Sequence, residues 1–159
     1  MLRLLIPLLV LMALPRVAAA DGWETYRHDA GHGAGVCPVD DAGSGDYFCL
    51  LVSCAPEGGP LWIRVAFAGG TMPDESPTLA ITVDDTAVAT RTLSRLPTQD
   101  ANDFGVLYDE DRDSALLESL AAGRAAVITL GTGASAITHG ISLSGSRRAL
   151  DALPKLCGT

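Results

Sequence analysis

The alternation of apolar and polar residues predicts that most of this chain forms short β-strands. Residues 61–67 alternate with a period of two, and residues 78–83 repeat the same pattern. Residues 84–85, both aspartates, then turn the chain into residues 86–90, which predicts a β-hairpin. A nearly continuous apolar run over residues 47–54 indicates a strand that is buried on both faces.

Weaker strand signals lie between turns that are rich in glycine, proline and aspartate. They are found at residues 23–26, 36–39, 104–108, 125–130 and 141–143. Pro38 lacks the N–H group that a central strand needs, so its segment is expected at a sheet edge. Residues 28–35 are rich in glycine and polar side chains, which predicts a loop.

Two short helices are predicted near the carboxyl end of the chain. The first covers residues 115–122 and follows an acidic stretch, in which Asp113 or Ser114 can cap the helix. The second covers residues 147–153 and ends at Pro154, because proline lacks the N–H group that continues a helix. Strands follow one another without alternating helices, which favours antiparallel pairing. We therefore expect a β-rich α+β fold: an antiparallel β-sandwich-like sheet with two short helices, cross-linked by disulfides.

Residues 1–20 are typical of a secretory signal peptide. A basic start precedes an apolar run over residues 4–14, and the three alanines at 18–20 form a small-residue cleavage pattern. The run is shorter than the roughly 20 apolar residues that span a bilayer. Cleavage would leave one exported domain, residues 21–159, in the periplasm or outside the cell. We expect no membrane insertion after cleavage.

The cysteine pattern agrees with export. Cys37, Cys49, Cys54 and Cys157 are even in number and show no C-x-x-C spacing, which argues for disulfides over a redox or zinc motif. Three pairings are possible in principle. We favour Cys37–Cys49, which closes a hairpin around residues 40–46, and Cys54–Cys157, which ties the last helix to the sheet.

The charge of the chain limits its partners. The formal net charge is −8, and loss of Arg3 and Arg16 with the signal peptide would change it to −10. A negative field repels phosphate backbones and anionic lipids, so we expect neither nucleic acid nor a membrane surface as partner. A cationic partner is permitted, although acidity is also the ordinary route to solubility.

The histidines give little evidence for a metal site. His28 and His32 are four residues apart, a spacing that places two ligands on one face of a helix. The glycines around them argue against a helix, so we expect loop histidines. His139 stands alone, without a recognisable motif.

Other patterns with catalytic or binding chemistry are incomplete. Asp109, Asp111 and Asp113 resemble the start of a calcium loop, but Ser114 and Leu120 occupy the positions of its glycine and last acid. A solvated helix N-terminus accounts for these acids.

Serine and phosphate-binding motifs are incomplete as well. Ser142 lies near glycines, but the second glycine of the G-x-S-x-G motif comes one position late. Residues 131–135 lack the lysine of a phosphate-binding loop. The sequence therefore predicts no catalytic residue, no cofactor and no metal.

Trp23 and Trp62 are the residues that we single out for a possible binding surface. With Tyr26, these tryptophans would form an exposed aromatic patch, the kind of surface that marks a binding module. The alternative is that they pack in the core and at sheet edges.

Several features together match the pattern of one family of exported proteins. They are Trp23 after the cleavage site, Cys54 at a strand end, and segments 61–65, 116–124, 127–130 and 141–153. On these features the chain resembles the invasion-associated locus B family of exported bacterial proteins. The resemblance implies a periplasmic or surface location and, in some members, a link to host-cell invasion. The activity of members is often unknown, and the family supplies no catalytic residues to carry over to this chain. Members are often basic, whereas this chain is acidic, which argues against a role at a host surface.

These observations give one functional hypothesis and two alternatives. We expect a non-enzymatic periplasmic or secreted binding or accessory protein with a protein partner in the cell envelope. The first alternative is a small exported hydrolase with a polar site assembled in space, which would need a histidine beside a nucleophile. The second is an acidic inhibitor of a secreted enzyme that presents residues 40–46 or 109–113 on a rigid loop.

Overall fold

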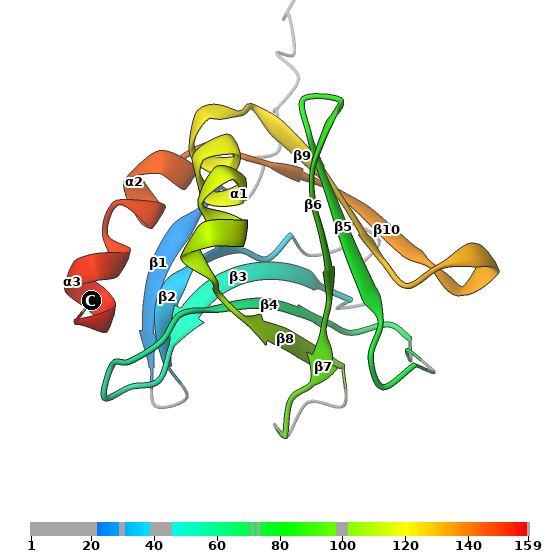
Figure 1. Cartoon of the computed structure of the whole chain (residues 1–159), viewed down its shortest axis with the longest axis horizontal. Coiled ribbons are helices and arrows are strands. Elements are labelled where there is room, and N and C mark those ends of the chain that lie inside the picture. Colours follow the sequence, from blue (N-terminus) through cyan, green and yellow to red (C-terminus); the bar gives the residue numbers. More distant parts are fainter. Residues whose placement is uncertain are drawn as a thin grey trace, which may run out of the picture.

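Two antiparallel β-sheets enclose the hydrophobic core in the computed structural model (Figure 1). The structure describes residues 22–28, 31–38, 46–70, 72, 74–97 and 102–158. The predicted signal peptide, residues 1–20, and residues 40–45 of the predicted turn lie outside the described residues. The predicted β-rich, antiparallel fold is confirmed.

The larger sheet has six strands. In spatial order they are β1 (Glu24–His28), β2 (Gly31–Val36), β3 (Phe48–Cys54), β4 (Trp62–Phe67), β8 (Asp103–Leu107) and β7 (Ser94–Arg95). All neighbouring pairs are antiparallel. The loop predicted over residues 28–35 is wrong, because β2 is an inner strand whose glycines lie beneath side chains of the neighbouring strands.

The smaller sheet has four strands. In spatial order they are β10 (Ile137–Ser142), β9 (Ala125–Leu130), β5 (Thr78–Val83) and β6 (Thr86–Thr92). Asp84 and Asp85 connect β5 to β6 with φ angles of 44° and 67°. Aspartate tolerates this left-handed conformation, which a two-residue hairpin turn requires. The predicted hairpin is therefore confirmed.

The helices follow the prediction with two corrections. They are α1 (Glu110–Ala122), the 3-10 turn η1 (Gly133–Ser135), α2 (Ser146–Leu150) and α3 (Leu153–Cys157). α1 starts earlier than predicted, because Asp109 is the N-cap and its carboxylate accepts a hydrogen bond from the Arg112 backbone N–H at 3.2 Å. The predicted last helix is divided into two, and Pro154 lies in the first turn of α3, where its missing N–H group breaks no helical hydrogen bond.

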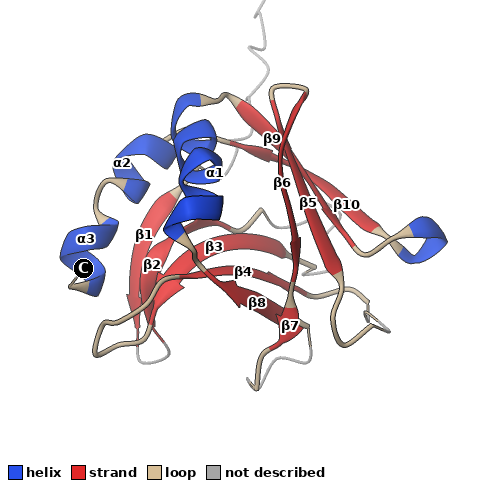
Figure 2. Ribbon diagram, in the orientation of Figure 1, coloured by secondary structure: helices blue, strands red, loops and turns tan. Residues whose placement is uncertain are grey.

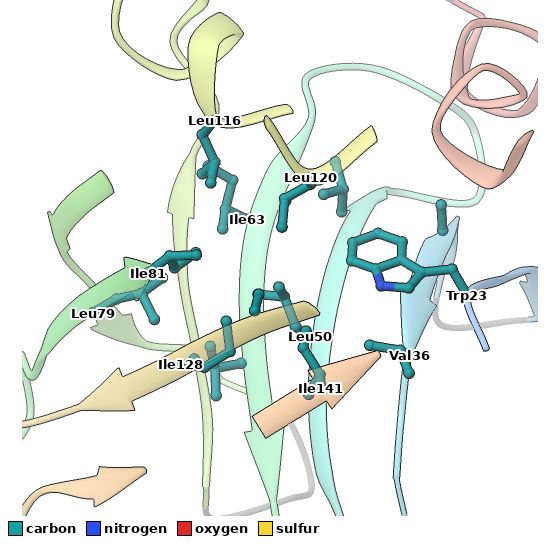
Figure 3. Packing of buried hydrophobic residues seen from close by; sticks show 14 of the residues in the cluster. Trp23, Val36, Leu50, Ile63, Leu79, Ile81, Leu116, Leu120, Ile128 and Ile141 are labelled. Atoms are coloured by element: carbon teal, nitrogen blue, oxygen red, sulfur yellow. The ribbon is translucent and has the colours of Figure 1, made fainter. Parts of the chain in front are cut away.

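The core lies between the two sheets and is closed on one side by α1 (Figure 3). Leu50 of β3 and Ile81 of β5 face each other's sheets and are 0% and 1% exposed. Leu116 and Leu120 of α1 complete the same cluster. Among the described residues, no helix has the length and apolar character needed to cross a membrane.

Two disulfides cross-link the fold in the pairing that the sequence analysis favoured. Cys37 bonds to Cys49 within the larger sheet, and Cys54 at the end of β3 bonds to Cys157 at the end of α3. None of these cysteines is free. Disulfides are typical of oxidising compartments outside the cytosol.

A buried ion pair attaches the start of α1 to the smaller sheet. Asp113 is 1% exposed, and its carboxylate bonds to the Arg91 guanidinium of β6. Asp113 also accepts a hydrogen bond from the Asp109 backbone N–H at 2.9 Å. The acid therefore fixes both the N-terminus of α1 and its position against β6.

Replacing Asp113 by alanine should destabilise the protein strongly. The substitution leaves the Arg91 charge without its partner, which costs about 3–5 kcal/mol for a buried pair. Urea unfolding followed by circular dichroism measures the change. The matched control is Asp111→Ala, an exposed acid in the same helical turn, which should cost less than about 1 kcal/mol. Equal losses in the two variants would contradict this role for the ion pair.

The two disulfides should differ in their contribution to stability. Their sequence separations are 103 for Cys54–Cys157 and 12 for Cys37–Cys49. In the chain-entropy model the long loop contributes about 4–5 kcal/mol and the short one about 3 kcal/mol. Urea unfolding of the two double serine variants tests this order. Alkylation of the native parent protein is the control, since two or more modified cysteines would refute the pairing.

Candidate functional site

The register of the larger sheet assigns each of its side chains to one of two faces. Residues opposite each other in antiparallel strands point to the same side, and neighbours along a strand point to opposite sides. One face carries core residues such as Leu50 and Val65. The other, which we call the outer face, is formed by Glu24, Tyr26, Gly33, Gly35, Cys49, Leu51, Ser53, Trp62, Arg64, Ala66, Asp103, Gly105 and Leu107.

The outer face is not covered by any helix of the described structure. Figure 2 shows α1, α2 and α3 together on the opposite side of the larger sheet. Their buried apolar residues, among them Leu116, Leu150 and Leu153, belong to the core cluster. Within the described part of the chain, Glu24 and Leu107 of the outer face are exposed, and Tyr26, Leu51, Trp62, Arg64 and Ala66 are partly exposed. A partner molecule can reach the outer face at these residues.

Glycines make one part of the outer face smooth. Gly33 lies between Tyr26 of β1 and Ser53 of β3 in the cross-strand register. A Cβ atom at Gly33 would lie 2.8 Å from the Tyr26 hydroxyl, so the tyrosine ring extends across this strand. Leu51 lies over Gly35 in the same way. These side chains cover β2 and explain why a glycine-rich segment is part of a sheet.

An ion pair lies beside this smooth region. The Nε atom of Arg64 donates to Oδ1 of Asp103 at 3.3 Å, and its Nη2 atom donates to Oδ2. Asp103 is 2% exposed, so the pair is partly desolvated, which strengthens the attraction between its charges. The guanidinium is thereby held in one orientation on the outer face.

Trp62 and Leu107 form the most apolar part of the outer face. They are cross-strand partners on β4 and β8, and Arg64 is the next residue of β4 on this face. Leu107 is 46% exposed and Trp62 is partly exposed. We call Tyr26, Leu51, Trp62, Arg64 and Leu107 the outer-face patch. It combines two leucines with tyrosine, tryptophan and arginine side chains, and the last three residue types are enriched in protein interfaces.

Tyr26 is the titratable group of this patch whose environment changes its ionisation. Burial raises the pKa of Tyr26 above its usual value of 10.0. Interaction with the Ser53 side chain and the nearby Arg64 charge act in the opposite direction and are smaller effects. The phenol is therefore held in its neutral form, as a hydrogen-bonding group within the sheet surface.

Trp23 does not belong to the outer-face patch. Its side chain is 1% exposed and lies in the core cluster, beside β2 (Figure 3). The prediction that Trp23 contributes to an exposed binding surface is therefore wrong. Burial of the large apolar indole beside α2 and β2 is favourable, because it removes the ring surface from water. Of the two predicted residues, Trp62 alone is on the surface.

The histidines lie on separate strands. His32 of β2 is opposite Arg27 of β1 and Cys54 of β3, whereas His28 belongs to β1 and its side chain lies outside the described residues. Within the described part of the chain, no group of three or more His, Cys, Asp or Glu side chains is placed to hold a metal ion.

His139 lies at a hollow between the two sheets. Its ring stacks on Phe48 with 4.4 Å between centroids. The hollow has a volume of about 280 Å³ and is lined by Pro38, Asp46, Tyr47, Phe48, Ala68, Gly69, His139 and Gly140. Ser142, the serine of the incomplete motif, accepts a hydrogen bond from the Ser144 backbone N–H at 3.2 Å. Both polar residues thus have structural contacts of their own.

The acidic stretch before α1 is part of the helix and its cap. Asp109 is the N-cap, Asp113 is buried against Arg91, and Asp111 is exposed in the first turn. This geometry explains the acids as a helix N-terminus, which confirms that part of the prediction. The prediction that all three acids are solvated is wrong for Asp113, which is buried. The same geometry does not present residues 109–113 as a protruding loop.

Comparison with protein-family models, curated protein sequences and solved structures finds no match for this chain. The interpretation of the outer-face patch therefore depends on its own geometry.

Stability at alkaline pH should depend on Tyr26. Because the folded protein raises the pKa of this phenol, its contribution to stability is present below pH 10.0 and is lost as pH rises through and above that value. Urea unfolding at about pH 8 and about pH 10.5 should show a smaller decline for Tyr26→Phe than for the parent protein. Tyr108→Phe is the comparison variant, because burial also raises the pKa of Tyr108, which lies outside the patch. Its decline should also be smaller than that of the parent protein, by an amount independent of Tyr26. An equal decline in Tyr26→Phe and the parent would contradict the assignment.

Proposed function

We propose that this chain is an exported, non-enzymatic binding protein that engages a protein partner in the cell envelope through the outer-face patch. One observation carries the proposal: on a sheet face that no helix of the described residues covers, the partly exposed Trp62 and the exposed Leu107 lie side by side, next to the ion-paired Arg64. Aromatic and arginine anchors of this kind supply most of the binding energy in protein interfaces. The ordered strands around them limit the entropy that binding would cost.

The proposed location has separate support. Residues 1–20 have the charge, apolar run and small residues of a signal peptide. The two disulfides fit an oxidising compartment such as the periplasm or the extracellular medium. The resemblance to the invasion-associated locus B family points to the same location and remains part of the proposal.

The two alternatives have weaker support in the geometry. A hydrolase would need a histidine poised beside a nucleophile, whereas the ring of His139 packs on Phe48. An inhibitor acting through residues 109–113 would need these acids exposed, whereas Asp113 is 1% exposed. The outer-face patch is therefore the surface on which we base the function.

Replacing Trp62 by alanine should strongly reduce partner capture. Loss of a central aromatic anchor costs about 2 kcal/mol or more, which corresponds to an affinity about 30-fold weaker. The immobilised protein is exposed to an envelope extract, and each captured protein is quantified by mass spectrometry for parent and variant.

Two further variants make the capture experiment specific. Leu107→Asp changes an exposed residue of the patch with little effect on packing and should reduce capture as well. Val127→Ala changes a residue that is 44% exposed on the smaller sheet and should leave capture unchanged. Equal recovery of every envelope protein by all folded variants would refute a binding role for the outer face.

A further inference from the structure

Unpaired positive charge gathers at one corner of this acidic protein. Of the arginines and the lysine in the described residues, five form ion pairs with carboxylates: Arg64, Arg91, Arg95, Arg112 and Arg124. The remaining ones are Arg27 of β1, Arg147 and Arg148 of α2, and Lys155 of α3, and all of them are exposed. Arg27 leaves β1 from the same face as Thr25, on the side where α2 contacts this strand.

Two shallow hollows flank Arg148 at this corner. One has a volume of about 380 Å³ and is lined by Trp23, Glu24, Thr25, Arg148, Ala149 and Ala152. The other has a volume of about 490 Å³ and is lined by Arg147, Arg148, Asp151, Ala152 and Lys155. The two linings together hold three cations, Arg147, Arg148 and Lys155, and two carboxylates, Glu24 and Asp151, so a net positive charge remains. We call Arg27, Arg147, Arg148 and Lys155 the basic corner.

The basic corner adjoins a free sheet edge. β1 is the end strand of the larger sheet. Trp23 precedes β1, and its backbone N–H donates to the Ser144 carbonyl at 2.8 Å, on the side away from β2. Backbone groups alternate between the two edges of a strand, so those of Thr25 and Arg27 point to the same free side. Among the described residues, none forms a hydrogen bond with these groups.

We propose that an acidic peptide segment of a partner protein joins the free edge of β1 as an added antiparallel or parallel strand. Its backbone would bond to Thr25 and Arg27, which is the way in which extended peptides extend exposed sheets. Side chains of the added strand alternate between the two faces of the sheet. Those on the α2 side meet the basic corner, so the segment should carry an acid at every second position.

The chemistry of the corner favours a peptide over a membrane. The exposed large hydrophobic residues of the described structure are Leu107 and Val127, and both lie on other surfaces. The corner therefore offers no apolar side chain for insertion into a bilayer. The formal net charge of −8 also repels an anionic lipid surface. A flexible peptide, in contrast to a lipid surface, can place its negative charges at the basic corner without approaching the acidic remainder of the protein.

Fluorescence anisotropy with three labelled ten-residue peptides tests the proposal on the oxidised protein. The first peptide alternates glutamate with valine or threonine, the second replaces each glutamate by glutamine, and the third has the first composition with the glutamates in one block. We expect the alternating acidic peptide to bind at least about tenfold more tightly than either control, and more weakly as salt rises.

Variants separate the charge contribution from the strand pairing. The double variant Arg148→Gln and Lys155→Gln should weaken binding of the alternating peptide about tenfold, while Arg112→Gln, an exposed change on α1, should leave it within about twofold. Thr25→Pro removes an N–H group from the free edge and none from the β1–β2 pairing, so it should abolish binding. Circular dichroism checks that Thr25→Pro is folded. If it is unfolded, the result of the double variant tests the proposal.

Several outcomes would overturn the proposal. They are unchanged affinity in the double variant, unchanged affinity in folded Thr25→Pro, and equal binding of the three peptides. Binding to phosphatidylglycerol vesicles without peptide binding would also reject it, as would self-association that depends on Arg148 and Lys155. Trp62→Ala should bind the peptide like the parent protein, so this result is independent of the outer-face patch.

Discussion

The register of β3 between β2 and β4 is the constraint on which the rest of this structure depends. β3 pairs with β2 and β4 so that Leu50 and Val52 point into the core and Ser53 points to the outer face. A shift of one residue would exchange the two sets and bury polar groups in place of the core. The same register points Cys54 towards α3, where Cys157 meets it. Core, outer face and the C-terminal cross-link therefore depend on a single alignment.

Local chemistry was sufficient to predict the parts of the fold in which each residue's preference agrees with its surroundings. The alternation of residues 61–67 and 78–83 gave strands, because half-buried strands need a period of two. Asp84 and Asp85 gave a hairpin, since they accept positive φ angles. The disulfide pairing followed from placing one short link in a hairpin and one long link at the chain's end.

The outer-face patch was mostly beyond prediction, because tertiary contacts determine it. Gly33 and Gly35 signalled a loop, whereas pairing with β1 and β3 and the cover of Tyr26 and Leu51 make this segment a strand. Trp62 was predicted, whereas the pairing of Arg64 with Asp103 depends on residues 39 apart in the chain. A useful signal was present, since glycine inside a strand often marks a site that another backbone approaches closely, as the Val52 carbonyl does at Gly33.

The Cys54–Cys157 bond has a consequence for survival among proteases. It encloses most of the domain, from the end of β3 through β4, both strands of the hairpin and α1 to α3, in one covalent ring. A single cut in any exposed connection of that ring, such as the turn between β5 and β6, opens the ring without releasing a fragment. The nicked molecule keeps its full mass, and the sheets still hold the new ends near each other. Such a domain tolerates its first cleavage, and only a second cut or a reductant separates the pieces.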